Sequence, residues 1–302
     1  MNATRPLALY FGEILWDFLP EGLFPGGAPL NAAYHMHQHG TDAQVVSAVG
    51  RDVLGDELLR RCTNWGLATE GIARLEDMPT GHVCVDIGQN GDARFDIVTN
   101  VAWDKISANN ACLRIAAKAD AFLFGSLAQR SLENRATLDR LLAALPKRAL
   151  RVFDANLRPP YDDLELVRQL ARKATVLKLN VAEAARLATN EIEMPGHEEA
   201  HARLLAEKSG CGFVVVTAGA RGAGMLRDGR WLWEPGRPVK VADTVGAGDA
   251  FAASLVAHLL HGQSPDREIL ARACRLGEWV ASQRGATPAY TSLQYHELNV
   301  IA

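Results

Sequence analysis

An alternation of short apolar runs with helical patterns restricts the fold more than any other feature of this sequence. Apolar runs at 121–124, 150–153, 176–179 and 213–217 are separated by helical patterns near 132–145 and 164–173 and by a third that begins at Val181. The short runs are typical of buried strands, and the longer patterns are typical of helices. Such alternation predicts βαβ units and a parallel sheet with helices on its faces.

The stretch between Gly71 and Val98 follows a different pattern, with a period of two residues. Apolar residues at 83, 85 and 87 alternate with His82, Cys84 and Asp86, and after a turn at 88–91 those at 93, 95 and 97 alternate with Arg94 and Asp96. This pattern predicts a hairpin with one apolar and one polar face. The hairpin is either an ordinary sheet edge or part of a small sheet that covers a ligand site.

Composition and charge exclude several classes of function. The chain has 302 residues and a formal charge of −3, so it offers no basic field for nucleic acid or anionic lipid. The apolar run at 250–260 is too short to span a membrane, and the first residues show no secretory signal, so we expect a cytoplasmic protein. The scattered cysteines argue against disulfides and zinc sites. We expect one continuous unit from residue 1 to 302.

The segment from Asp243 to Asp249 has the composition of an anion site. Gly246, Ala247 and Gly248 precede a long apolar helical run, which would bring unpaired N–H groups and the positive end of a helix dipole to one point. Phosphate is the obvious anion, and the Asp249 carboxylate beside it could deprotonate a hydroxyl. Taken alone, Asp249 is more readily explained as a helix cap. The P-loop pattern and the G-x-G-x-x-G fingerprint are both missing.

Two motifs give the sequence a family resemblance. Residues 26–33 read Gly-Gly-Ala-Pro-Leu-Asn-Ala-Ala, and residues 243–249 read Asp-Thr-Val-Gly-Ala-Gly-Asp. In this order they resemble the signatures of the ribokinase-like (PfkB) carbohydrate kinases, fructokinases in particular. The resemblance, which extends over the whole chain, implies an α/β fold: a ribokinase-like doubly wound sheet flanked by helices, with a small β-sheet lid from segments near 12–25 and 70–100. It also implies ATP-dependent phosphorylation of a sugar hydroxyl, with fructose as the expected acceptor and fructose 6-phosphate as the product.

The resemblance further implies a role for each matching residue. Asp249 would be the general base, Gly246, Ala247 and Gly248 the anion hole, and Arg158 a neighbour of the sugar or the migrating phosphoryl group. Sugar-binding positions are matched by Asp17, Gly27, Asn31 and Asn156, and positions on the phosphate and nucleotide side by Asn180, Glu183, Thr217, Gly219 and Gly222. Glu183 would reach Mg²⁺ through water. Asp243, with carbonyl groups near Gly285, would hold a monovalent cation such as K⁺.

Several of these residues also have simpler explanations. Asn31 can cap a helix, Arg158 can form a surface ion pair, and Asn180 with Glu183 can cap their own helix. Val245 stands where the second signature usually has Thr, which puts any contact through that hydroxyl in doubt. His35 and His39 share a helix face, but no carboxylate or thiolate accompanies them, so we do not expect a metal there.

Three other functions fit part of the pattern. A 2-keto-3-deoxygluconate kinase would need a second Arg or a Tyr in the lid for its substrate's carboxylate, and Arg94 is the candidate. A catalytically silent sugar or nucleotide sensor would have no use for Asp249, and an NAD-dependent sugar dehydrogenase would need the missing fingerprint. The hairpin also predicts a two-fold dimer, because a lid that opens cannot bury its apolar face permanently on its own subunit. That face consists of Val83, Val85, Ile87, Phe95 and Ile97.

Overall fold

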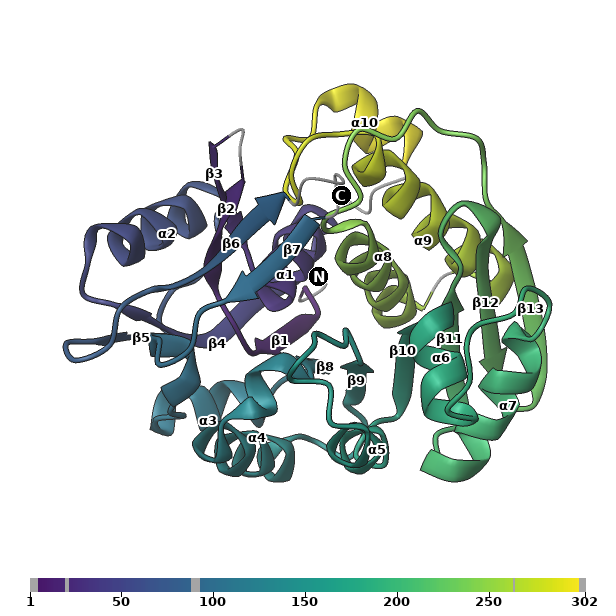
Figure 1. Cartoon of the computed structure of the whole chain (residues 1–302), viewed down its shortest axis with the longest axis horizontal. Helices are drawn as coiled ribbons and strands as arrows, with labels where there is room; N and C mark the ends of the chain where they lie inside the picture. The colour runs from purple at the N-terminus through teal and green to yellow at the C-terminus, as the bar shows by residue number, and fades with distance from the viewer. Residues whose placement is uncertain (1–4, 20–21, 88–92, 263, 299–302) are drawn as a thin grey trace.

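A large sheet forms the centre of the molecule (Figure 1). The structure is a computed structural model that describes residues 5–19, 22–87, 93–262 and 264–298. The strands of the large sheet are β1 (Leu7–Phe11), β4 (Asp42–Gly50), β5 (Ile72–Leu75), β8 (Ala121–Gly125), β9 (Leu150–Asp154), β10 (Val176–Asn180), β11 (Phe213–Thr217), β12 (Gly222–Arg227) and β13 (Arg230–Pro235). Their order is β13-β12-β11-β10-β9-β8-β1-β4-β5, and all neighbours from β11 to β5 are parallel. The predicted parallel sheet is therefore confirmed, with β12 and β13 added antiparallel.

Helices cover both faces of this sheet (Figure 1). One face carries α1 (Ala28–Gln38), α2 (Val53–Asn64), α8 (Ala247–His261) and α9 (Asp266–Ala281). The other carries α3 (Asn110–Ala116), α4 (Leu132–Ala144), α5 (Leu164–Ala171), α6 (Val181–Ala188) and α7 (Glu198–Ser209), and α10 (Ser292–Glu297) follows α9 in the chain. Side chains alternate along β1, so that Leu9 and Phe11 join one core while Ala8 and Tyr10 join the other. Among the described residues, no helix has the length and apolarity to cross a membrane.

The sheet reverses its direction of winding between β1 and β8. The chain passes from β1 to β4 on one side and later from β8 to β9 on the other. In open parallel sheets of this kind, ligands bind outside the carboxyl ends of the strands at the reversal. Glu13 follows the end of β1, and Asp154 ends β9, so polar side chains stand at that edge.

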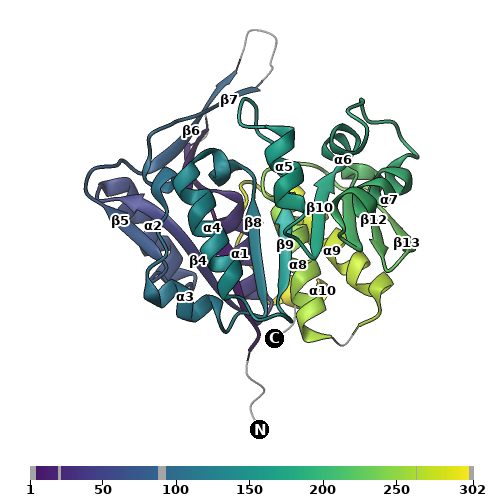
Figure 2. The ribbon, with the colours of Figure 1, turned by 90° about the horizontal axis from the view of Figure 1, so that it is seen from below.

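The predicted hairpin is part of a separate small sheet. Its strands are β2 (Leu15–Leu19), β3 (Gly22–Gly26), β6 (Gly81–Ile87) and β7 (Ala93–Ile97), in the order β3-β2-β6-β7. The β6–β7 hairpin projects from the body in Figure 2 and pairs Val83 with Ile97. The expected second lid segment, near 70–100, differs in one respect: β5, at its start, pairs with β4 at the edge of the large sheet.

The apolar face of the hairpin is partly covered by its own chain. Val83 and Ile97 are 6% and 8% exposed and pack in the core that contains Val101 and Trp103. The argument that this face must be covered by a second subunit therefore does not hold for these two residues. The side chains of 85–95, which include Val85, Ile87, Arg94 and Phe95, lie outside the described residues.

Candidate active site

The Gly246-Ala247-Gly248 turn opens α8, and Asp249 follows in the first helical turn. The first intrahelical bond runs from the N–H of Ala250 to the carbonyl of Gly246 at 2.8 Å, so the N–H groups of Gly248 and Asp249 precede it. Gly246 has φ +77°, and a Cβ there would lie 2.4 Å from the Cβ of Ala286. The turn thus has both the backbone conformation and the close packing that require glycine.

Asn31 connects α1 to Asp249. Its Nδ2 donates a hydrogen bond to Oδ2 of Asp249 at 2.9 Å, although 218 positions separate the two residues. The helix-cap explanation is wrong for both residues, because α1 already begins at Ala28 and the Asp249 carboxylate is bound to Asn31. Asn31 is 3% exposed, and its Oδ1 has no hydrogen-bond partner within the described protein. Oδ1 of Asn31 is therefore a buried hydrogen-bond acceptor that has no partner among the described residues and lies next to the Asp249 carboxylate.

Three further carboxyl groups share the electrostatic environment of Asp249. Burial raises the pKa of Asp249 to about 6, with repulsion from Asp154 adding to the effect and the Asn31 hydrogen bond opposing it. Burial, together with the Asp249 charge, also raises the pKa of Asp17 to about 6 and that of Glu13 to about 7. The positive charge of Arg158 lowers each of these three pKa values. The fold thus places these charged groups, which come from four segments of the chain, close enough to shift one another's pKa values.

A buried ion pair, to which the sequence motifs assign no role, lies against the Gly246–Gly248 turn. Lys178 Nζ lies 2.8 and 3.0 Å from the carboxylate oxygens of Asp154, and its side chain is only 8% exposed. A Cβ on Gly248 would meet that Nζ at 3.1 Å, so the amine packs directly against the turn. Burial alone would lower the pKa of Lys178, but the carboxylates of Asp154 and Glu183 raise it. The cation therefore stays charged beside the turn.

Asn180 and Glu183 form the helix cap that was their simpler explanation. Oδ1 of Asn180 accepts from the N–H of Glu183 at 2.9 Å, and Oε2 of Glu183 accepts from the N–H of Asn180 at 2.8 Å. Oε1 of Glu183 accepts from the N–H of Leu157 at 2.8 Å. Glu183 therefore also anchors the loop that carries Arg158, whose own Nη1 donates to the Leu157 carbonyl at 3.0 Å.

Asp243 and Gly27 hold backbone segments around the site. Oδ1 of Asp243 accepts from the N–H of Val245 at 3.0 Å, and Oδ2 accepts from that of Gly285 at 3.2 Å. Gly27 has φ +101°, and a Cβ there would lie 2.3 Å from the Glu13 carbonyl oxygen. Asp243 thus connects the loop of the second signature to the segment before Ala286, while Gly27 lets α1 begin close to the end of β1.

The remaining expected residues make their contacts elsewhere. Asn156 stands after β9 with φ +40°, Thr217 donates to the Leu179 carbonyl at 3.4 Å, and Gly219 opens the short helix η3 (Gly219–Arg221). Gly222 packs against β13, where a Cβ would lie 2.0 Å from the Glu234 carbonyl oxygen. These contacts do not connect them to Asp249. Within the described residues, no group of three His, Cys, Asp or Glu side chains is placed to hold a metal ion.

Comparison with known proteins assigns the chain to a family. The family model described as "pfkB family carbohydrate kinase" matches residues 22–292. A fructokinase of Klebsiella pneumoniae is 28% identical over 84% of this chain and 85% of its own length. Fructokinase-2 of Oryza sativa subsp. japonica is 27% identical over 95% of this chain and 92% of its own.

Solved structures share the fold at lower identity. A fructokinase from Xylella fastidiosa with bound ATP has a TM-score of 0.81 and 22% identity, covering 93% of this chain and 94% of its own. A 2-dehydro-3-deoxygluconokinase from Thermotoga maritima has 0.82 and 20%, covering 97% and 99%. A Vibrio cholerae fructokinase double mutant with fructose, ADP and potassium has 0.81 and 22%, covering 96% of each chain.

Proposed function

This chain belongs to the pfkB family of carbohydrate kinases, and we propose that it transfers the γ-phosphoryl group of ATP to fructose, giving fructose 6-phosphate. The observation that carries the proposal is the hydrogen bond between Asn31 and Asp249, which joins the two signature segments and leaves a free buried acceptor beside a carboxylate. A sugar hydroxyl could donate to Oδ1 of Asn31 while Asp249 accepts the proton of the reacting hydroxyl. The fructokinases among the relatives support fructose as the sugar.

Asp249 is the proposed general base. Its pKa of about 6 leaves the carboxylate largely ionised at neutral pH while keeping it basic enough to accept a proton in the transition state. Asn31 fixes the orientation of the carboxylate by holding Oδ2. Asp17, on β2 of the small sheet, and Gly27 and Asn156 are proposed to complete the sugar site. The small sheet would thereby exclude water, which otherwise competes as the phosphoryl acceptor.

The α8 turn is proposed to stabilise the migrating phosphoryl group. The free N–H groups of Gly248 and Asp249 and the helix dipole favour negative charge at this point. Lys178 lies directly behind Gly248, and Arg158 adds a second positive charge. Phosphoryl transfer depends mainly on such positioning and charge stabilisation, so these groups suffice for the chemistry that the chain itself must supply.

The phosphate and nucleotide side is assigned to Asn180, Glu183, Thr217, Gly219 and Gly222. Mg²⁺ supplies charge neutralisation on the phosphates and typically keeps several of its waters. Both oxygens of Glu183 already accept backbone N–H groups, so its proposed contact with the ion passes through water. For a monovalent cation we propose Asp243 together with the carbonyl groups near Gly285, a residue whose N–H already donates to Asp243. The Vibrio cholerae fructokinase structure contains potassium, which supports K⁺ as the cation.

The test is an ADP-release assay on fructose, ribose, adenosine and 2-keto-3-deoxygluconate. We expect fructose to give the highest kcat/KM, and Asp249→Asn to lose at least ~10²-fold in kcat while still binding sugar, since an amide cannot accept the proton. Asp228→Asn, at an exposed turn, is the matched control and should retain wild-type activity.

Three results would contradict the proposal. Preference for the keto-deoxy acid would assign the other kinase activity, and sugar binding without turnover would indicate a sensor. An Asp249→Asn variant with more than a tenth of the wild-type kcat would exclude Asp249 as the base.

A further inference from the structure

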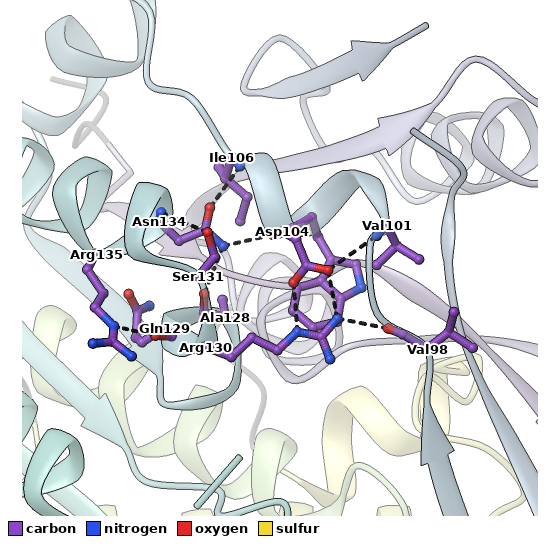
Figure 3. Close-up of polar contacts among 11 residues, drawn as sticks. Val98, Val101, Asp104, Ile106, Ala128, Gln129, Arg130, Ser131, Asn134 and Arg135 are labelled. Carbon is purple, nitrogen blue, oxygen red and sulfur yellow. Dashed lines mark hydrogen bonds and ion pairs between the residues drawn. The ribbon is translucent and has the colours of Figure 1, made fainter. Parts of the chain in front are cut away.

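Arg130 connects the small sheet to the loop that carries Arg158. Figure 3 shows its contacts with Asp104 and Val98. Arg130 is the last residue of the short helix η2 (Leu127–Arg130), which follows β8 at the reversal of the sheet, and its side chain is 7% exposed. Nε and Nη2 donate to the two carboxylate oxygens of Asp104 at 2.7 and 2.9 Å. Nη2 also donates to the carbonyl of Val98 at 2.8 Å.

Two aromatic rings also lie against the guanidinium, whose Nη1 is buried without a hydrogen-bond partner among the described residues. The Arg130 carbon Cζ lies 3.8 Å from the ring centre of Trp103 and 4.7 Å from that of Tyr161. Asp104 and Trp103 belong to the short helix η1 (Ala102–Lys105), and Oδ2 of Asp104 also accepts from the N–H of Val101 at 3.2 Å. A planar, forked cation is the side chain that can pair with a carboxylate at two points and stack on rings at once.

Through Val98, the contacts of Arg130 are linked to Asp17. Val98 directly follows β7, and its N–H donates to the carbonyl of His82 on β6 at 3.3 Å. The strand β6 pairs in turn with β2, with Val83 opposite Asp17. A displacement of Val98 would therefore be transmitted through two paired strands to the carboxylate of Asp17.

Through Tyr161, the contacts of Arg130 are linked to Arg158. Tyr161, whose ring covers Arg130, donates its backbone N–H to the Arg158 carbonyl at 2.8 Å. Glu183 holds the same loop from the opposite side through the N–H of Leu157. Arg130 thus contacts both the exit of the small sheet and the loop of Arg158.

We propose that Arg130 is a positioning residue that sets the placement of Asp17 relative to Arg158 and thereby determines sugar affinity. This inference rests on the proposed function in so far as Asp17 and Arg158 bind the sugar. The proposed role predicts different effects of Arg130 on the binding of the two substrates, the sugar and ATP. No hydrogen bond or cation–π contact joins Arg130 to Asn180, Thr217 or Gly219, so its loss should affect sugar binding and spare ATP.

The test compares variants that remove the connection in different ways. Arg130→Met combined with Asp104→Leu removes both charges of the buried pair and avoids leaving one uncompensated, so we expect a folded chain. Arg130→Lys keeps the charge but cannot pair at two points, reach Val98 and stack at once. Arg135→Met is the matched control. Arg135 donates to the carbonyl of Gln129 within η2 at 2.6 Å (Figure 3), and among the described residues it has no hydrogen bond to the small sheet and no stacking contact with Tyr161.

We expect both Arg130 variants to raise the KM for the sugar at least tenfold, with the KM for ATP within twofold of wild type and the control unchanged. Amide hydrogen exchange should become faster at both 97–101 and 156–161. A folded variant with unchanged sugar KM, or with equal increases for sugar and ATP, would overturn the inference. If the wild type phosphorylates no sugar, the proposed function fails by itself, and unchanged exchange in either segment would then overturn the role of Arg130.

Discussion

The acid side of the pH–rate profile should move to higher pH when Asn31 is replaced by Ala. Asp249 can accept a proton only as a carboxylate, so activity falls as the pH drops below its pKa, which is about 6. The hydrogen bond from Asn31 Nδ2 stabilises the ionised form and lowers that pKa. Removing the donor therefore raises the pKa, and the loss of activity should begin at a higher pH.

The size of the shift follows from the kind of bond. A hydrogen bond to a charged group contributes about 1.5–3 kcal/mol, and one pKa unit corresponds to about 1.36 kcal/mol. Water entering the space left by the amide replaces part of this, so we expect the lower end, about one unit. At pH 6, about half of the wild-type Asp249 is ionised, against about a tenth in the variant. At pH 8 both are almost fully ionised, and the difference largely disappears.

Asp154→Asn supplies a comparison of opposite sign. The Asp154 charge raises the pKa of Asp249, so its removal should move the acid limb to lower pH. The assay is kcat at saturating sugar and ATP between pH 5 and 8, with thermal unfolding to confirm a folded chain. Asp17 and Glu13 titrate in the same range, so the readout is the displacement between variants. An unmoved limb in Asn31→Ala, or shifts of the same sign in both variants, would refute the reasoning.

Two further predictions concern the α8 turn and the hairpin. Gly246→Ala should lower kcat at least tenfold in steady-state assays, because the residue has φ +77° and the new Cβ would lie 2.4 Å from that of Ala286; near-wild-type kcat would show that the turn is not in contact with the transferred group. Wild-type chains should sediment as dimers at micromolar concentration and Val85→Asp as monomers with weakened sugar affinity. A monomeric wild type would exclude the dimer, and a dimeric variant would place its contact elsewhere.

The sheet could be predicted from the sequence because its strands are apolar and regularly spaced. The runs predicted at 121–124, 150–153, 176–179 and 213–217 are β8, β9, β10 and β11. The position of β5 could not be predicted, because Ile72–Leu75 is four residues long and carries no mark of which sheet it joins. Its pairing with β4 is set by the chain path through α2, which sequence periodicity does not encode.

The site residues that lie in sequence motifs could be predicted. The site residues that strand pairing brings together could not. Asn31 and Asp249 lie in the two signatures, and the fold brings them together. Lys178 and Asp154 became partners only because β10 and β9 are neighbours with these residues in register. The local sign was a lysine within an otherwise apolar run, and a lysine buried in a strand needs a carboxylate nearby.

The hairpin shows how a sound physical premise can be applied too broadly. Its apolar face does need cover, but residues close to the point where a lid joins the body move little when the lid moves. Val83 and Ile97, at that end, are buried by their own chain, and fully burying a valine contributes about 1.5–3 kcal/mol. The dimer proposal therefore rests on Val85, Ile87 and Phe95. A charge at Val83 should destabilise the subunit itself, whereas a charge at Val85 should break the dimer and weaken sugar affinity while the subunit stays folded.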